Sequence, residues 1–360
     1  MNIKRPTLLI NEAVARKNIA RMANKAKSSG VELVPHFKTP QSIQIGQWYK
    51  DEGIISITVS SVSMAKYFQQ GGWENITIAF PLNIQEIDDV SELANKTNLT
   101  LLVNEPGQVE VLKSNVSTVT DVVIEVDCGS KRSGVDPGDH EVIQRMIDLL
   151  ENSPHQFKGF YSHFGHTYNA RSKEEILGVF KASLEILHAL KERFSDYGPQ
   201  LSIGDTPSAS ILDKFESVKS IHAGNFVFYD LMQVQIGACD EQDIAVVLAC
   251  PVVSKNHKRN EVVVYGGGVH LSKESMFDRE LNTTIYGKPV RITATGWSEY
   301  IPGSYVKSLS QEHGIIHLND EAYESFNVGD TIGILPVHSC MTADSMREYI
   351  DLKGDKFDHL

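Results

Sequence analysis

The stretch Val31-Glu32-Leu33-Val34-Pro35-His36-Phe37-Lys38-Thr39 is a short apolar run that leads into a lysine. It is the first of eight β-rich runs, most of which are followed by a helical pattern before the next begins. Such alternation is typical of the α/β class and predicts a (β/α)8 TIM-type barrel. The runs cover residues 32–37, 55–61, 76–80, 99–104, 121–127, 157–163, 201–205 and 219–223.

Helices are predicted where apolar residues recur at helical spacing. Residues 172–194 place Ile176 and Phe180 on one face, residues 139–150 show the same pattern, and a helix over residues 12–28 precedes the first run. A doubly wound open sheet is the rival architecture. No GxGxxG follows an early run, which disfavours a dinucleotide-binding fold.

From about residue 244 the helical pattern stops and short β runs follow, separated by turn signals such as Pro302-Gly303. This change predicts a second, mostly antiparallel β domain. The expected domains are therefore a barrel over residues 1–243 and a β domain over residues 244–360. The β runs lie at residues 244–253, 261–265, 290–294, 305–308, 314–318 and 331–335.

Polar residues follow five of the eight barrel runs. Active sites of closed barrels lie at the C-terminal ends of the strands, so these residues are expected to share one rim. They are Lys38, Arg132, the group His163, Gly165, His166 and Tyr168, the turn Gly204-Asp205-Thr206-Pro207-Ser208, and the pair Gly224-Asn225.

The residue types at this rim suggest a carbonyl cofactor that carries a phosphate. Lys38 can form a Schiff base if its surroundings lower its pKa. The turns at Gly204 and Gly224 allow backbone N–H groups to approach phosphate oxygens. A surface lysine, two ordinary turns, and a salt-bridged structural role for Arg132 are the alternative interpretations. Tyr161 and Tyr168 could equally be packing residues.

Near the end of the chain, Pro336-Val337-His338-Ser339-Cys340 puts an imidazole and a thiol two residues apart after a β run. Residues two apart on a strand point to the same face, so one ion could contact both side chains. Thiolate and imidazole together favour zinc, and two protein ligands would leave positions open for substrate. The alternative is a buried cysteine beside a hydrogen-bonded histidine.

Composition excludes several classes of protein. A net charge of −12 argues against nucleic-acid binding, and no apolar run is long enough to cross a membrane. The four widely spaced cysteines and the absence of a signal-like N-terminus favour a reducing compartment, so a cytoplasmic location is expected.

Five motifs in order resemble the D-serine dehydratase and D-threonine aldolase family, among the alanine-racemase-type (fold-type III) pyridoxal phosphate enzymes. The resemblance covers nearly the whole chain and implies a barrel, a β domain and a homodimer with an active site shared between barrel and β domain. The motifs are Pro35-His36-Phe37-Lys38-Thr39, Gly165-His166-Thr167-Tyr168, Ser202-Ile203-Gly204-Asp205-Thr206-Pro207-Ser208, Gln311-Glu312-His313-Gly314 and Pro336-Val337-His338-Ser339-Cys340.

The resemblance also implies roles for individual residues. Lys38 would hold pyridoxal 5'-phosphate covalently, and Arg132 would lie near the phenolic oxygen of the cofactor. His338 and Cys340 match the metal pair, expected to bind Zn2+. Other expected cofactor-binding residues are Tyr161, Tyr168, Gly204, Asp205, Thr206, Gly224 and Asn225.

The expected function is a pyridoxal phosphate- and zinc-dependent lyase acting on a D-β-hydroxy amino acid. Family aldolases typically carry His-x-Asp where this chain has His338 and Cys340, which favours dehydration of the D-serine type. The alternatives are a D-threonine aldolase-like C–C lyase, an amino-acid racemase, and a non-catalytic pyridoxal phosphate-binding protein.

Overall fold

The computed structural model describes residues 2–360 and divides them into two compact units. The barrel unit contains Ala20–Lys38 and Gly46–Gly224. The β unit contains the residues up to Ile19, together with Thr39–Ile45 and Asn225–Leu360. The expected domain boundary between residues 243 and 244 stays a prediction.

The barrel unit is built on an eight-stranded parallel sheet, in the order β2-β9-β8-β7-β6-β5-β4-β3. A bridge between His36, in the segment after β2, and Thr58 of β3 joins the two edges of the sheet, which brings it close to a closed barrel and confirms the predicted fold class. Each strand overlaps one of the eight predicted runs. The strands are β2 (Glu32–Leu33), β3 (Ser56–Val59), β4 (Asn75–Pro81), β5 (Asn98–Val103), β6 (Asp121–Glu125), β7 (Gln156–His163), β8 (Gln200–Gly204) and β9 (Ser220–Ile221).

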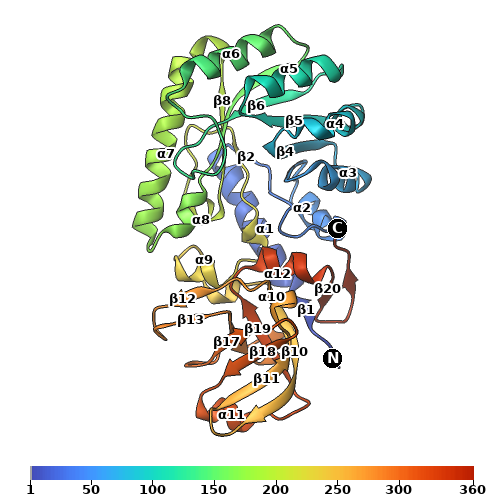
Figure 1. The fold of residues 1–360 in the computed structure, drawn as a ribbon, viewed down its shortest axis with the longest axis vertical. Helices are drawn as coiled ribbons and strands as arrows, with labels where there is room; N and C mark the ends of the chain where they lie inside the picture. Colours follow the sequence, from blue (N-terminus) through green and yellow to red (C-terminus); the bar gives the residue numbers. More distant parts are fainter. Residues whose placement is uncertain (1) are drawn as a thin grey trace. The chain divides into compact units, whose positions relative to one another are not determined.

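Helices lie outside these strands (Figure 1). In α7, Ile176, Phe180 and Leu187 are buried, and the Ser172 side chain caps the helix by accepting a hydrogen bond from Glu175 N. The expected helices at residues 12–28, 139–150 and 172–194 are confirmed. The helices of the first 224 residues are α1 (Glu12–Ser29), α2 (Ile43–Asp51), α3 (Val62–Gln70), α4 (Ile87–Ala94), α5 (Pro106–Asn115), α6 (His140–Glu151), α7 (Lys173–Arg193) and α8 (Thr206–Ile211).

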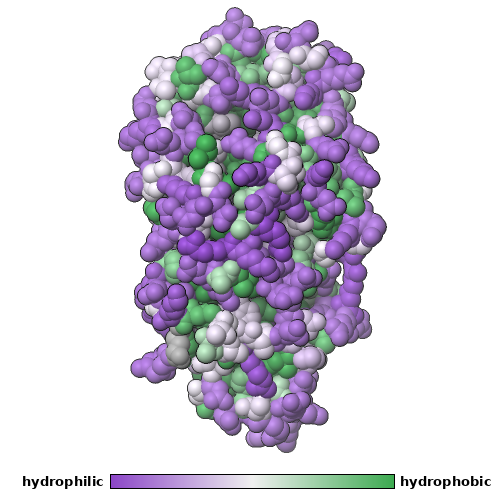
Figure 2. Space-filling model, turned by 180° about the vertical axis from the view of Figure 1, so that it is seen from behind, coloured by the Kyte–Doolittle hydropathy of each residue, from purple (hydrophilic) through white to green (hydrophobic). Residues whose placement is uncertain are grey.

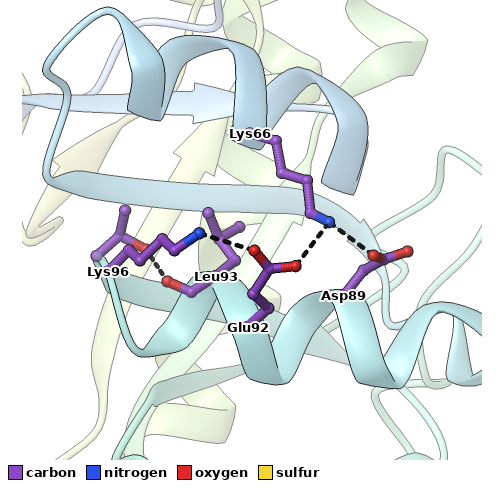
Figure 3. A network of polar contacts seen from close by, with 6 residues as sticks. Lys66, Asp89, Glu92, Leu93 and Lys96 are labelled. Carbon is purple, nitrogen blue, oxygen red and sulfur yellow. Dashed lines mark hydrogen bonds and ion pairs between the residues drawn. The ribbon is translucent and has the colours of Figure 1, made fainter.

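An ion-pair network links α3 and α4 on the outside of the barrel (Figure 3). Lys66 Nζ lies 2.6 Å from Asp89 Oδ1 and 3.4 Å from Glu92 Oε2, and Lys96 Nζ lies 2.7 Å from Glu92 Oε1. Water reaches all four side chains, so the network contributes little to stability. Its position on the outer surface separates it from the polar residues at the strand ends.

The β unit contains a nine-stranded sheet in which nearly all neighbours run antiparallel, as the sequence predicts. The predicted run at 290–294 is divided between β14 and β15. Strand β1 was not predicted; it pairs with β10 and, in parallel, with β20. The sheet strands are β1 (Thr7–Ile10), β10 (Val246–Asn256), β11 (Glu261–Tyr265), β14 (Gly287–Val290), β17 (Tyr305–Leu309), β18 (His313–His317), β19 (Thr331–Pro336), β20 (Tyr349–Asp351) and β21 (Lys356–Phe357).

Shorter elements complete the β unit. Two small hairpins pair β12 (Met276–Asp278) with β13 (Thr283–Ile285) and β15 (Ile292–Thr293) with β16 (Gly296–Trp297). Its helices are α9 (Leu231–Gln235), α10 (Gly268–Leu271), α11 (Asp320–Ser325) and α12 (Ser339–Met346).

The surface visible in Figure 2 is mostly polar, as expected for a chain in which 22% of the residues are charged. On this face, apolar residues lie in small separate patches (Figure 2). Within residues 2–360, none of the helices combines the length and the apolar character needed to cross a membrane.

Candidate functional site

Lys38 follows the first barrel strand in a tight turn and has an exposed side chain. Its backbone N–H donates to His36 Nδ1 at 3.3 Å. Just before the turn, Phe37 N donates to Thr58 O and Thr58 N donates to Pro35 O, at 2.8 and 2.9 Å. The lysine is therefore at the C-terminal end of a strand, where the sequence predicted it, and backbone bonds to β3 anchor the residues before it.

Two buried imidazoles, His36 and His222, and the half-buried imidazole of His163 lie in the barrel unit with Lys38. Burial lowers the pKa of His36 well below its ordinary value, and the positive charges of Lys38 and Arg132 lower it further. Burial and the same two cations lower the pKa of His163 to about 3, and burial alone lowers that of His222 to about 3. These histidines are neutral near pH 7, so the fixed positive charge here comes from Arg132. Such an environment favours an anionic ligand.

Arg132 lies on a loop that several hydrogen bonds fasten to the end of β6. Glu125 Oε1 accepts a bond of 2.8 Å from Ser133 Oγ, and Asp127 Oδ1 accepts bonds from two backbone N–H groups of the loop. Burial raises the pKa of Glu125, although the Ser133 hydrogen bond and the Arg132 charge oppose this shift. The sequence interpretation missed Glu125 because an acidic residue inside an apolar run carries no motif.

We expect Gly134→Ala to destabilise this loop. Gly134 has a φ of +110°, and a Cβ there would lie 2.6 Å from Asp127 N and 2.7 Å from Val126 C. These are backbone atoms that cannot move aside, and the φ value itself disfavours alanine. The unfolding free energy should fall by about 1–3 kcal/mol, measured by urea denaturation. Gly107→Ala is the matched control, since a Cβ at Gly107 meets no atom within 4 Å. Equal stability of the two variants would contradict the expectation.

The turn after β8 has the features of a phosphate site. Asp205 caps α8 by accepting from Ser208 N at 2.7 Å and also accepts from Thr167 Oγ1 at 3.0 Å. Burial raises the pKa of Asp205 to about 6. Thr206 N lies 3.5 Å from the Tyr168 hydroxyl, and Thr206 Oγ1 is buried with no hydrogen-bond partner in the chain. A buried hydroxyl without a partner, at a turn that presents backbone N–H groups, fits a bound phosphate.

Tyr161 is a core residue of the barrel rather than a surface group. It packs with Leu102 and Val123, and burial raises the pKa of its phenol far above the ordinary value. A Cβ added at Gly204 would lie 2.7 Å from the Tyr161 hydroxyl, so this close approach requires glycine. Four expected cofactor residues, Tyr161, Tyr168, Gly204 and Thr206, thus lie around one turn.

The expectation that His338 and Cys340 lie on a strand is wrong. Strand β19 ends at Pro336, His338 precedes α12, and Cys340 is in its first turn. The two side chains still meet in a hydrogen bond. The two side chains meet because α12 begins between the residues, and not because alternate residues of a strand share a face.

The surroundings of Cys340 favour its thiolate. Burial would raise the thiol pKa, but the hydrogen bond and charge of His338, with bonds from Thr39 and Asn225, hold it below its ordinary value. Thr39 Oγ1 lies 3.2 Å and Asn225 Nδ2 3.4 Å from Cys340 Sγ. Burial would lower the pKa of His338, but the hydrogen bond and charge of Cys340 outweigh burial and raise it above its ordinary value. A thiolate beside an imidazole is a donor set that suits zinc.

Across residues 2–360, no group of three or more His, Cys, Asp and Glu side chains is arranged to hold a metal ion.

The two residues of the second expected phosphate turn belong to different units. Gly224 is buried directly after β9 in the barrel unit. The Asn225 side chain belongs to the β unit, where it donates to Asp230 Oδ2 at 2.8 Å and to Ser339 Oγ at 3.1 Å. The side chain of Asn225 is thus placed beside Cys340, and a phosphate contact would have to use its backbone.

Comparisons with known proteins agree with this architecture. The family models "Alanine racemase, N-terminal domain" and "Putative serine dehydratase domain" match residues 10–228 and 245–351. The D-serine dehydratase of Dictyostelium discoideum is 28% identical, over 98% of this chain and 94% of that protein. The 3-hydroxy-D-aspartate aldolase of Paracoccus denitrificans is 21% identical, over 98% and 90% of the two chains.

Solved structures confirm the fold. D-threo-3-hydroxyaspartate dehydratase from Delftia sp. HT23 superposes with a TM-score of 0.88 at 23% identity, over 99% of this chain and 98% of that one. A mutant of D-threo-3-hydroxyaspartate dehydratase in the metal-free form gives a TM-score of 0.91 at 24% identity, with the same coverage. The chain therefore belongs to the alanine racemase N-terminal domain family, within the D-serine dehydratase and D-threonine aldolase group of fold-type III pyridoxal phosphate enzymes.

Proposed function

We propose that this protein is a pyridoxal phosphate- and zinc-dependent lyase that converts a D-3-hydroxy amino acid of the D-serine type into a 2-oxo acid and ammonia. The class, a pyridoxal phosphate-dependent lyase, follows from the family and from relatives that are dehydratases and aldolases. The observation that carries the finer proposal is the thiol–imidazole pair His338–Cys340, in a chain that also has Lys38 in the turn after its first barrel strand.

The residues of the barrel unit fit the cofactor. Lys38 offers the amine, Arg132 the nearby positive charge, and the Thr206 hydroxyl a buried donor without a partner. When bound, pyridoxal phosphate supplies an electron sink for the bonding electrons of the substrate Cα. The proposed cofactor-binding set is Lys38, Arg132, Tyr161, Tyr168, Gly204, Asp205, Thr206 and Gly224 of the barrel unit, with Asn225 of the β unit.

The residues of the β unit fit the metal. His338 and Cys340 would hold Zn2+ and leave positions for the substrate. When bound, zinc supplies a Lewis acid for the β-hydroxyl, which is a poor leaving group without one. The metal-free form of D-threo-3-hydroxyaspartate dehydratase is consistent with a metal in a relative of this chain.

Lys38 is assigned the proton transfer. Its amine takes the proton from Cα, and the hydroxyl leaves from Cβ, so the substrate loses one water. Addition of water then releases ammonia, and D-serine gives pyruvate and ammonia in equal amounts. The imidazoles of His36 and His163 are neutral, so Arg132 is the positive charge that remains for an anionic substrate group.

We expect the cofactor-loaded protein to release ammonia and a 2-oxo acid in a 1:1 ratio from D-serine or another D-3-hydroxy amino acid. The measurement is a panel of D-amino acids assayed for ammonia, 2-oxo acid, glycine and aldehyde, with the L-amino acids as the matched control. Glycine plus aldehyde would identify the aldolase reaction, which the Paracoccus denitrificans relative favours as the second candidate. Formation of L-serine would indicate a racemase, and cofactor binding without turnover would indicate a carrier.

The homodimer and the cytoplasmic location stay predictions. Light scattering of the purified protein tests the first, and cell fractionation tests the second.

A further inference from the structure

A chain of side-chain hydrogen bonds, buried except at its half-buried end Ser202, crosses the interior of the barrel unit. Ser202 Oγ lies 2.8 Å from Ser220 Oγ, which lies 2.9 Å from His222 Nε2. His222 Nδ1 lies 2.7 Å from Thr58 Oγ1, and Thr58 Oγ1 donates to Val34 O at 2.8 Å. The chain thus connects β8, β9, β3 and the segment that follows β2, and His222 was not predicted to have a role.

The direction of every bond in this chain can be worked out. The Thr58 hydroxyl has one hydrogen, which goes to a carbonyl oxygen that can only accept. His222 Nδ1 must therefore carry a proton and donate to Thr58 Oγ1. The imidazole is neutral because burial lowers its pKa to about 3, so Nε2 accepts from Ser220. Ser202 then donates to Ser220, and each hydroxyl and ring nitrogen has a defined partner.

This chain reaches the part of the barrel where a single bridge takes the place of a ladder between strands. Strand β2 has only two residues, and both pair with β9 on one side. On the other side, the connection to β3 is a bridge between His36, which follows β2, and Thr58. Thr58 uses its backbone to bond Pro35 and Phe37, and its side chain to bond Val34. Lys38 is the next residue after Phe37. Thr58 therefore bonds three of the four residues in the segment 34–37. The hydrogen bond from His222 fixes the Thr58 side chain.

We infer that the Ser202–Ser220–His222–Thr58 chain positions Lys38 by holding the β2–β3 seam of the barrel in register. These are positioning residues, because they act on Lys38 through the backbone of residues 34–37. The inference rests on the proposed role of Lys38 as the cofactor-binding amine. It predicts that removing one hydroxyl inside the barrel changes the behaviour of a lysine with which that hydroxyl makes no direct bond.

The test compares Thr58→Val with Thr58→Ser, which keeps the hydroxyl. Thr58→Val removes the partner of His222 Nδ1–H and the donor to Val34 O, so two buried polar groups lose their bond. In the apo protein, exchange of the backbone amides of His36 and Phe37, which donate to Ala223 O and Thr58 O, should accelerate roughly ten- to a hundredfold. Covalent capture of pyridoxal phosphate on Lys38, trapped with borohydride and quantified by mass spectrometry, should fall roughly tenfold or more. Thr58→Ser should restore both values to near wild type.

Thr77→Val is the matched control. Thr77 is a buried threonine on the neighbouring strand β4, outside the hydrogen-bonded chain. The same isosteric change there should leave both readouts within about twofold of wild type. If Thr58→Val changes only the global unfolding free energy and leaves amide exchange at His36 and Phe37 and capture on Lys38 as in Thr77→Val, the residue is structural and the inference is wrong.

Two substitutions at His222 test the bond direction independently. Asparagine can place an N–H near the position of Nδ1, whereas glutamine reaches toward the position of Nε2. We expect His222→Asn to retain more capture on Lys38 than His222→Gln, since only asparagine supplies a donor to Thr58. The reverse order would overturn the assigned direction. If the wild type and Lys38→Ala capture the cofactor equally, the proposed role of Lys38 is wrong. If Lys38→Ala loses capture but the Thr58 and His222 variants capture the cofactor as well as wild type, the role of Lys38 stands and this inference alone fails.

Discussion

Lys38→Ala should fold normally, bind no pyridoxal phosphate covalently and lose lyase activity by roughly ten-thousandfold or more. The amine is both the covalent anchor and the group that takes the Cα proton, so one change removes two functions. The side chain is exposed at the end of a strand, and its loss leaves no cavity in the core. Borohydride trapping followed by mass spectrometry measures the anchor, and ammonia release from D-amino acids measures the activity.

Lys219→Ala is the matched control for this variant. Lys219 precedes β9, at the opposite end of the barrel strands from Lys38, so its loss should leave capture and turnover within about twofold of wild type. Cofactor trapped on another lysine, or full activity of Lys38→Ala, would contradict the assignment. Unchanged circular dichroism and unfolding midpoint in both variants would show that the fold is intact.

Cys340→Ala and His338→Ala should keep the cofactor but lose elimination from D-serine by roughly a thousandfold or more. The cofactor residues Lys38 and Thr206 are in the barrel unit, whereas the metal pair is in the β unit, so cofactor capture should survive. A chelator should reproduce the loss in wild type, and added zinc should reverse it there but not in Cys340→Ala. β-Chloro-D-alanine, which has a better leaving group, should depend much less on the metal.

Cys239→Ala is the control for these variants, because Cys239 is another half-buried cysteine of the β unit and lies outside the pair. It should behave as wild type with both substrates. Full dehydration of D-serine by the chelated enzyme would show that His338 and Cys340 form a structural pair and that the zinc proposal is wrong.

Much of the barrel could be predicted from sequence because each parallel strand is buried on both faces. Residues 99–103, for example, are apolar except for Thr100, and the strand found there is Asn98–Val103. Strand β1 was missed for the opposite reason. Thr7–Ile10 is four residues long, and its partners include Ala249 and Ile350, which are far away in the sequence. Local patterns contain no information about pairing over such distances.

The candidate site divides in the same way. Lys38 and the turn at Gly204 follow apolar runs, so a strand-end rule finds both. His222 and Glu125 were missed, because a single histidine or glutamate acquires its importance only from the side chains that burial brings next to it. The expected strand placement of His338 and Cys340 failed because the helix α12 begins between them.

The sequence by itself determined the α/β class, the number of barrel strands and the family, because burial periodicity and motif order are local properties of the chain. Only the tertiary structure decided which titratable groups stay neutral, that Cys340 meets Thr39 and Asn225, and that Thr58 joins His222 to the segment before Lys38. Hydrogen bonds between residues more than 100 positions apart and the desolvation of buried groups depend on the packed fold, which no local pattern records.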